Sequence, residues 1–140
     1  MKEEILKLLY IYSLNKRIFD KTAIEILYNI FINNNYDIEK YFKKIIITNE
    51  DDIVALYSQE KNSIIININK IIKEFTEGIK VFKLDEIQGY FFLNIQLLVC
   101  LFHELEHIKQ RNIAQENTIF GKFIYYGITL NKKIVATNMT

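Results

Sequence analysis

The chain's only two histidines lie four residues apart, and a glutamate follows the first, in the stretch His103-Glu104-Leu105-Glu106-His107. Four residues of α-helix turn by about 400° and rise by about 6 Å, so both imidazoles project from one face on successive turns. Two imidazoles placed in this way can bind one metal ion, and the pattern H-E-x-x-H is typical of helical zinc sites. The spacing therefore predicts that His103 and His107 are metal ligands.

Glu104 lies beside this pair and has the chemistry of a general base. Its carboxylate could hold a water molecule that the metal activates, and could accept the proton during attack on a peptide carbonyl. A plainer interpretation is a helix that carries two surface or packed histidines and binds no metal. The metal content of the purified protein distinguishes these two interpretations.

Three other polar side chains near the motif each allow two interpretations. Arg111 continues the histidine face by one more turn and could orient a substrate carbonyl or carboxylate. An arginine at this place can also cap the end of the helix and stay solvated. Tyr125 and Tyr126 could stabilise an oxyanion through their phenols, or could serve only in aromatic packing.

Cys100 is the only cysteine. It shares the face of His103, but one helix cannot readily wrap Cys100, His103 and His107 around a single ion, because the outer two lie about 10 Å apart along its axis. We therefore expect Cys100 to be a small buried hydrophobe. A lone cysteine also excludes disulfides within the chain and fits a reducing cytoplasm.

Composition and charge restrict the class of protein. Half of the 140 residues are apolar, which predicts one folded domain with a real core. Lys and Arg total 18 against 17 Asp and Glu, without a basic stripe, so nucleic acid is not an expected partner. The start of the chain lacks the features of a signal peptide, and no run reaches transmembrane length, so we expect a cytoplasmic protein without a membrane partner. The many aromatic residues permit a homo-oligomer but do not require one.

The elements that must position the motif follow from hydrophobic periodicity. Residues 1–44 are predicted to be helical, because apolar residues recur there at helical spacing. A capping box at Thr22–Glu25 starts the second helix, and the asparagines at 33–35 end it. Asp37 is predicted to cap a third, shorter helix that reaches Phe42.

Residues 45–68 change in character. Short β-branched runs at 45–48, 53–58 and 63–68 predict a small antiparallel sheet of two to three strands. The polar residues 59–62 form a loop of hairpin size between the last two runs. The sequence therefore predicts an α+β domain.

The motif belongs to the longest predicted helix, residues 85–111, which begins with a capping box at 85–88. Its first half is apolar almost all round, so it is expected in the middle of the domain. A less regular helical stretch near 70–75 precedes it, and a C-terminal helix and tail, 112–140, follow. The whole chain, residues 1–140, is expected to be one domain.

The predicted order of elements resembles the zincin metallopeptidases: helices come first, then a small sheet, and then a buried helix that carries the motif. The motif with its flanking residues reads Leu101-Phe102-His103-Glu104-Leu105-Glu106-His107-Ile108. The resemblance is greatest to the compact intracellular ImmA/IrrE type, and it extends loosely from Asp52 to Tyr126. It implies a minimal zincin-like fold, Zn²⁺ on the two histidines, Glu104 as general base and a repressor protein of a mobile element as substrate. It also implies that an edge strand, here residues 63–68, pairs with the extended substrate, unless another subunit covers that strand.

Two positions depart from the family pattern. Glu106 stands where glycine is frequent, and Lys109 stands where an apolar residue is usual. These two side chains are three residues apart on the helix and could pair on its surface, which leaves the spacing of the histidines unchanged.

A catalytic zinc normally has three protein ligands, and the resemblance implies an acid on the following helix as the third. Ile113 excludes the metzincin continuation, which needs histidine there. Glu116 is the one acid downstream of His107. If Asn112 breaks the long helix and caps a new one, Glu116 falls on an apolar stripe, where a carboxylate needs a partner or a metal. On an unbroken helix Glu116 would point about 180° away from His107. Glu116 could then be an exposed residue or the partner in a salt bridge, and the third ligand could lie beyond Thr140.

The sequence thus predicts an intracellular zinc-dependent metallopeptidase that hydrolyses a peptide bond in a protein substrate with metal-activated water. The alternative is a catalytically inactive zincin-like binding or regulatory module of a phage or mobile element. A purely helical interaction protein would leave unexplained why its only histidines fall in register.

Overall fold

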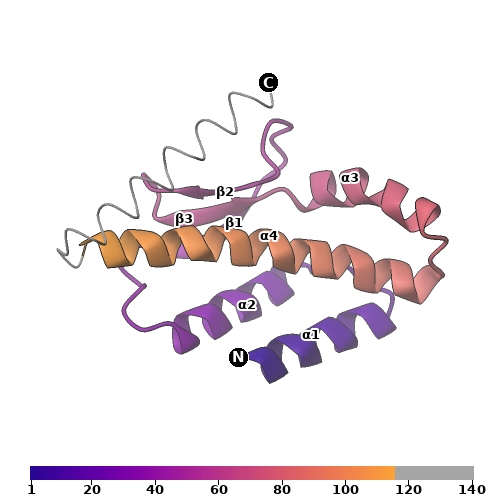
Figure 1. Cartoon of the computed structure of the whole chain (residues 1–140), viewed down its shortest axis with the longest axis horizontal. Coiled ribbons are helices and arrows are strands. Elements are labelled where there is room, and N and C mark those ends of the chain that lie inside the picture. Colours follow the sequence, from indigo (N-terminus) through magenta and orange to yellow (C-terminus); the bar gives the residue numbers. More distant parts are fainter. Residues whose placement is uncertain (116–140) are drawn as a thin grey trace.

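The computed structural model describes residues 1–115, which form an α+β arrangement of four helices and three strands (Figure 1). The elements are α1 (Lys2–Leu14), α2 (Lys21–Asn34), β1 (Lys44–Ile47), β2 (Ala55–Ser58), β3 (Ser63–Ile66), α3 (Ile68–Val81) and α4 (Glu86–Gln115). Helix α4 extends through the middle, with α1 and α2 on one side and the sheet and α3 on the other (Figure 1). The α+β class predicted from the sequence is therefore confirmed.

The second helix starts two residues earlier than its local pattern suggested. Asp20, and not Thr22, is the N-cap of α2, and its Oδ1 accepts a hydrogen bond of 3.0 Å from the Ala23 N–H. The same carboxylate accepts bonds from the Tyr12 hydroxyl at 2.8 Å and from Arg17 at 2.5 Å. These partners come from the preceding helix and loop, so a capping pattern read within α2 could not reveal them.

The short helix predicted after Asp37 is a turn. Asp37 has a φ of 61°, in the left-handed region, and not the extended backbone of an N-cap. The Tyr41 N–H donates to the Ile38 carbonyl at 2.9 Å, which closes a single turn. Ile38 and Phe42 are both buried, so side-chain packing sets this segment.

The sheet is mixed, and the prediction of an antiparallel sheet was wrong for β1. The strand order is β1-β3-β2, with β1 parallel and β2 antiparallel to β3. The loop at 59–62 reverses the chain between β2 and β3, as predicted. The connection from β1 to β2 also reverses it, so β1 and β3 run in the same direction.

Strand β3 lies in the centre of the sheet, with every residue buried. The expectation that residues 63–68 form a substrate-binding edge strand is therefore wrong, because both sides of β3 are already paired. The strand also stops at Ile66, and Asn67 caps α3 by accepting a hydrogen bond of 3.0 Å from the Lys70 N–H. The edges of the described sheet are β1 and β2.

Helix α4 begins with the predicted capping box. The Asp85 N–H donates to Gln88 Oε1 at 3.0 Å, and the Gln88 N–H donates to Asp85 Oδ1 at 2.8 Å. The helix does not end at Arg111 but continues through Asn112 to Gln115. Asparagine costs a helix only a few tenths of a kcal/mol, and the buried Ala114 anchors the last turn.

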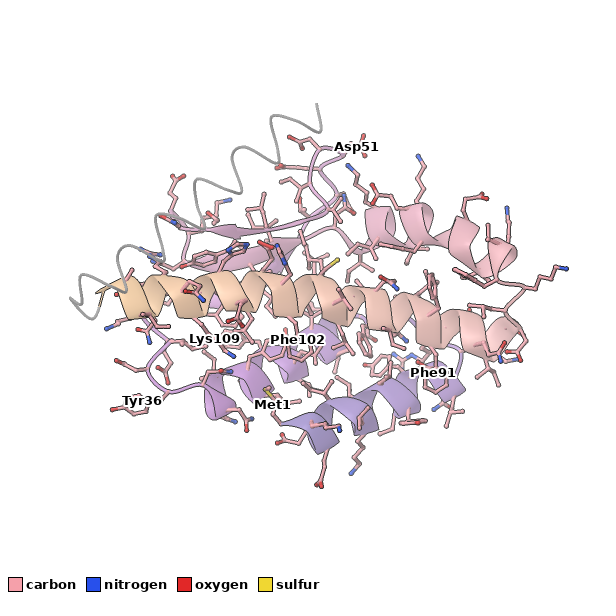
Figure 2. The ribbon with its side chains drawn as sticks, in the orientation of Figure 1. Met1, Tyr36, Asp51, Phe91, Phe102 and Lys109 are labelled. Atoms are coloured by element: carbon pink, nitrogen blue, oxygen red, sulfur yellow. The ribbon has the colours of Figure 1, made fainter. Side chains whose placement is uncertain are left out.

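The apolar first half of α4 is buried on most of its circumference but not on all of it. Figure 2 shows Phe91 and Phe102 on the side of α1 and α2, where their rings contact Tyr10 and Phe31. Between these rings along the helix, Val99 is 55% exposed, and Ile95, one turn before it, is 41% exposed. One narrow apolar stripe of α4 therefore faces solvent.

Among the described residues, Glu86–Ala114 of α4 is long and apolar enough to cross a membrane. This differs from the expectation that no run reaches transmembrane length. A core helix of a globular protein meets the same criterion, and α4 packs here against α1, α3 and the sheet.

Candidate metal centre

Helix α4 brings His103 and His107 together as their spacing predicts. Their Nε2 atoms lie 3.3 Å apart, and the two rings are nearly perpendicular, at 88°, with centroids 4.9 Å apart. His103 is exposed and His107 is half-buried. The pair therefore lies where the buried part of α4 reaches the surface.

The separation of these nitrogens fits a shared metal ion. Zinc binds imidazole nitrogen at about 2.0–2.1 Å, and two such nitrogens on a tetrahedral ion lie about 3.3–3.4 Å apart. The ligand atoms of His103, Glu104 and His107 all lie within 4.8 Å of one another. Imidazole and carboxylate are also the ligand types that zinc takes in proteins.

Glu104 is almost fully buried, at 3% exposure, and one of its oxygens is held by the sheet. Oε1 accepts a hydrogen bond of 3.0 Å from the backbone N–H of Tyr57 in β2. A carboxylate has two oxygens with about four acceptor positions, and this bond occupies one of them. The side chain is thus oriented before any ligand arrives.

The N–H of Tyr57 is directed at α4 because β2 is an edge strand. Asn67 donates to the Val54 carbonyl at 2.8 Å, so these residues form a hydrogen-bonded pair of the antiparallel ladder. Pairs of this kind alternate along the ladder, which directs the N–H of Tyr57 away from β3. Sequence reasoning missed Tyr57, since nothing local distinguishes it from other strand residues.

Arg111 lies on the predicted face but is bound to the protein, and it neither caps the helix nor stays solvated. Its Nη1 donates to the Tyr57 hydroxyl at 2.7 Å and to Asn62 Oδ1 at 2.6 Å. The guanidinium carbon lies 4.5 Å from the centre of the Tyr41 ring. In this arrangement Arg111 joins α4 to the β2–β3 hairpin.

Two smaller expectations hold. Glu106 and Lys109, the departures from the family pattern, approach to 4.0 Å on the exposed surface of the helix. Cys100 is half-buried and not fully buried, but it packs against the core, and burial, together with the carboxylates of Glu104 and Glu74, raises the pKa of its thiol. A thiol with a raised pKa is a poor nucleophile at neutral pH, which agrees with a structural role.

Three predicted site residues, Glu116, Tyr125 and Tyr126, lie outside the described residues. The turn at Asn112 that would have brought Glu116 back toward the histidines is absent, because α4 continues through that position. Within residues 1–115, the one cluster of metal-ligating side chains consists of His103, Glu104 and His107.

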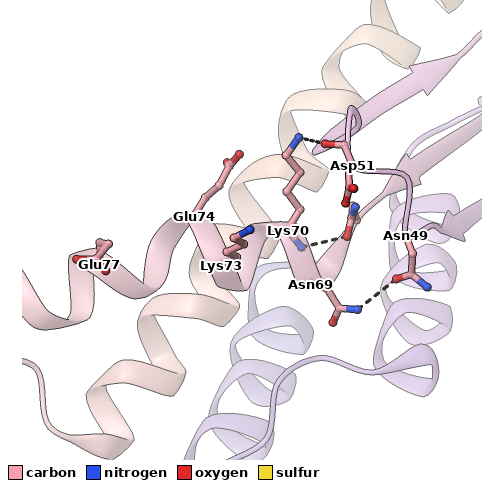
Figure 3. Close-up of a pocket in the computed structure, with 8 residues that line it drawn as sticks. Asn49, Asp51, Asn69, Lys70, Lys73, Glu74 and Glu77 are labelled. Carbon is pink, nitrogen blue, oxygen red and sulfur yellow. Dashed lines mark hydrogen bonds between the residues drawn. The ribbon is translucent and has the colours of Figure 1, made fainter.

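A separate polar hollow of about 840 Å³ lies where the β1–β2 connection meets the start of α3 (Figure 3). Its groups hold the fold together: Lys70 Nζ donates to the Asp51 carbonyl, and Asn69 donates to Asn49 Oδ1 at 3.2 Å. None of the residues of the metal cluster lines this hollow.

No family model, curated protein or solved structure matches this chain.

Proposed function

We propose that this protein is a zinc-dependent metallopeptidase that hydrolyses a peptide bond in a protein substrate. The observation that carries the proposal is the distance of 3.3 Å between the Nε2 atoms of His103 and His107, with the buried Glu104 beside them. This separation is the one that a tetrahedral zinc ion requires of two imidazole nitrogens. An N–H···N hydrogen bond between the two rings has the same length, so the metal itself must be measured.

In this proposal His103 and His107 hold the ion through neutral imidazoles. Zinc would supply Lewis acidity toward the peptide carbonyl and would lower the pKa of water. Glu104 would accept the proton as the nucleophile attacks, and would pass it to the leaving amine. Its bond to the Tyr57 N–H keeps the carboxylate in one orientation, which reduces the entropy lost on reaching the transition state.

A third protein ligand is still required for a catalytic site of the usual kind. We propose Glu116, the one acid after His107, for this place; because α4 continues unbroken through Asn112, this role requires the chain to turn back after Gln115. The change Glu116→Gln should then weaken zinc binding by at least about tenfold. An unchanged zinc affinity would mean that another group, or water, is the third ligand.

Metal binding is the first test. The purified protein should bind one Zn²⁺, as measured by competition with a chromophoric chelator, and His103→Ala and His107→Ala should each weaken binding at least about 100-fold. Glu106→Gln is the matched control, because Glu106 lies between the histidines, is exposed and pairs, within residues 1–115, with Lys109. If the two histidine variants bind zinc as tightly as this control, the site does not exist.

Catalysis needs a second test, with internally quenched random octapeptides as substrate. Glu104→Gln should keep zinc and lose at least about 100-fold in hydrolysis, whereas Glu106→Gln should change neither. Equal hydrolysis by both variants would show that Glu104 is not the general base.

One observation favours a second function, that of an inactive binding or regulatory module. Glu104 is buried and within reach of both histidines, so it could itself be the third ligand of a structural zinc site. In that case Glu104→Gln should lose zinc affinity, and removal of zinc should destabilise the fold without affecting any hydrolysis.

A further inference from the structure

Tyr57 joins the edge of the sheet to α4 at two separate places. Its backbone N–H donates to Glu104 at 3.0 Å, and its hydroxyl accepts from Arg111 at 2.7 Å. The hydroxyl also donates to the Tyr41 carbonyl at 2.6 Å. Since Glu104 and Arg111 are two turns apart on nearly the same face of α4, about 10 Å along its axis, β2 is fixed in both position and tilt.

The Arg111 side chain is the strongest of these connections. It carries a permanent charge and a planar set of donors, which here reach three acceptors on the β2–β3 hairpin, the most distant being the Gln59 carbonyl at 3.5 Å, while its face lies over the Tyr41 ring. Asn62, one of the acceptors, has a φ of 49° at the end of the hairpin loop. Asparagine tolerates this left-handed backbone, which helps to place its amide oxygen for Arg111.

We infer that Arg111 is a positioning residue of the metal centre, which holds Tyr57 against α4 so that the Tyr57 N–H orients Glu104 beside His103 and His107. The catalytic consequence of this inference rests on the proposed function, but the contact itself does not. Strand β2 has only one neighbouring strand in the described sheet. Its outer edge therefore depends on bonds to α4 for its position.

A test that needs no metal uses the amide proton of Tyr57 in the metal-free protein, observed by NMR. Glu104→Gln should shift this resonance, because it replaces a charged acceptor by a neutral one. Arg111→Gln should speed hydrogen exchange at the Tyr57 amide at least about tenfold, as the strand opens locally. Lys109→Gln is the matched control: Lys109 lies on the side of α4 away from the sheet (Figure 2), and its loss should leave this exchange unchanged.

The functional test compares the same variants loaded with zinc. Arg111→Gln should lower the kcat for the random octapeptides by about 10- to 100-fold and keep zinc affinity within about threefold, as expected for a residue that acts through the base. Arg111→Lys should restore part of this kcat, because an ammonium can still donate to the Tyr57 hydroxyl. Tyr57→Phe, which removes the hydroxyl and keeps the N–H, should reproduce the loss if Arg111→Gln does not fold.

The outcomes separate this inference from the proposed function. Unchanged exchange at the Tyr57 amide in both Arg111→Gln and Tyr57→Phe overturns the inference, even in a protein that binds zinc and cleaves peptides. Faster exchange in a protein that binds no zinc supports the positioning contact and contradicts the proposed function. A loss of kcat in Arg111→Gln that matches the loss in Lys109→Gln also overturns the inference, since charge alone then explains it.

Discussion

The backbone N–H of Tyr57 and the carboxylate of Glu104 meet at 3.0 Å across the interface between the edge strand β2 and helix α4. This bond joins the sheet to the one residue of the metal cluster that is almost fully buried. The carboxylate therefore has a structural role as well as its proposed chemical one, and the two roles can be measured separately.

We expect Glu104→Ala to lower the free energy of unfolding of the metal-free protein by about 1–3 kcal/mol, because it leaves the Tyr57 N–H without its acceptor. Glu104→Gln should be the more stable of the two variants, since the amide oxygen can accept the same bond. Urea denaturation followed by circular dichroism measures both values. An Ala variant as stable as the Gln variant would show that this bond contributes nothing to the fold.

Asp20 should make the stability of the fold depend on pH in the acid range. The bond from the Ala23 N–H is the main cause that lowers the pKa of Asp20, with further help from Tyr12 and Arg17. A carboxyl whose pKa is lower in the folded state stabilises the fold above its unfolded pKa of about 3.9, and this contribution is lost as the pH falls through the folded value.

The change Asp20→Asn keeps an N-cap acceptor and removes the titration, so its stability should fall less than that of the wild type between about pH 5 and pH 2. Asp20→Ala should lose about 0.5–2 kcal/mol at neutral pH through loss of the cap. Thermal unfolding at several pH values provides the measurement. Parallel pH profiles of the wild type and the Asn variant would contradict the role of the charge.

Asn94 should be among the most sensitive positions outside the metal cluster. Its fully buried amide accepts from the Phe19 N–H at 2.9 Å and donates to Ser13 Oγ at 3.1 Å and to the Arg17 carbonyl at 3.0 Å. Asn94→Leu should therefore cost at least about 2 kcal/mol, because it leaves these partners buried and unpaired.

The half-buried Gln96, two residues further along α4, is the control for Asn94. Gln96→Leu should change the free energy of unfolding by less than about 0.5–1 kcal/mol. Urea denaturation of both variants gives the comparison. Equal losses of unfolding free energy in the two variants would mean that any replacement of a polar residue by leucine in α4 destabilises the protein, and that the hydrogen bonds of Asn94 are not the cause.

Two helical glycines should respond differently to alanine. A Cβ on Gly89 would lie 3.4 Å from Ile79 Cδ1, an ordinary contact, whereas a Cβ on Gly78 would lie 3.0 Å from Phe92 Cζ. Gly89→Ala should stabilise the protein by about 0.5–1 kcal/mol through the reduced entropy of the unfolded chain. Gly78→Ala should stabilise the protein less than this, or should destabilise it, since the Phe92 ring must move. A larger increase in Tm for Gly78→Ala than for Gly89→Ala would refute this account.

Several features of the fold follow from residues close together in the chain. The hairpin loop at 59–62, the capping box at Asp85 and Gln88, and the helical character of the start of the chain were all predicted, because turns, caps and helical periodicity depend on neighbours. The predictions that failed concerned the N-caps at Thr22 and Asp37, the direction of β1, the central place of β3 and the continuation of α4 through Asn112. Strand partners and helix ends depend on packing against distant segments, which a local pattern does not contain.

The same division applies to the metal centre. The sequence by itself determined that His103 and His107 share one helical face, because the period of the α-helix sets that geometry from their spacing alone. Only the tertiary structure decided how Glu104 is held and what Arg111 binds, since both contacts run through Tyr57, 47 and 54 residues away in the chain. Contacts over such separations arise when an edge strand packs on a helix, and no local rule of spacing specifies which strand residue will meet which helix residue.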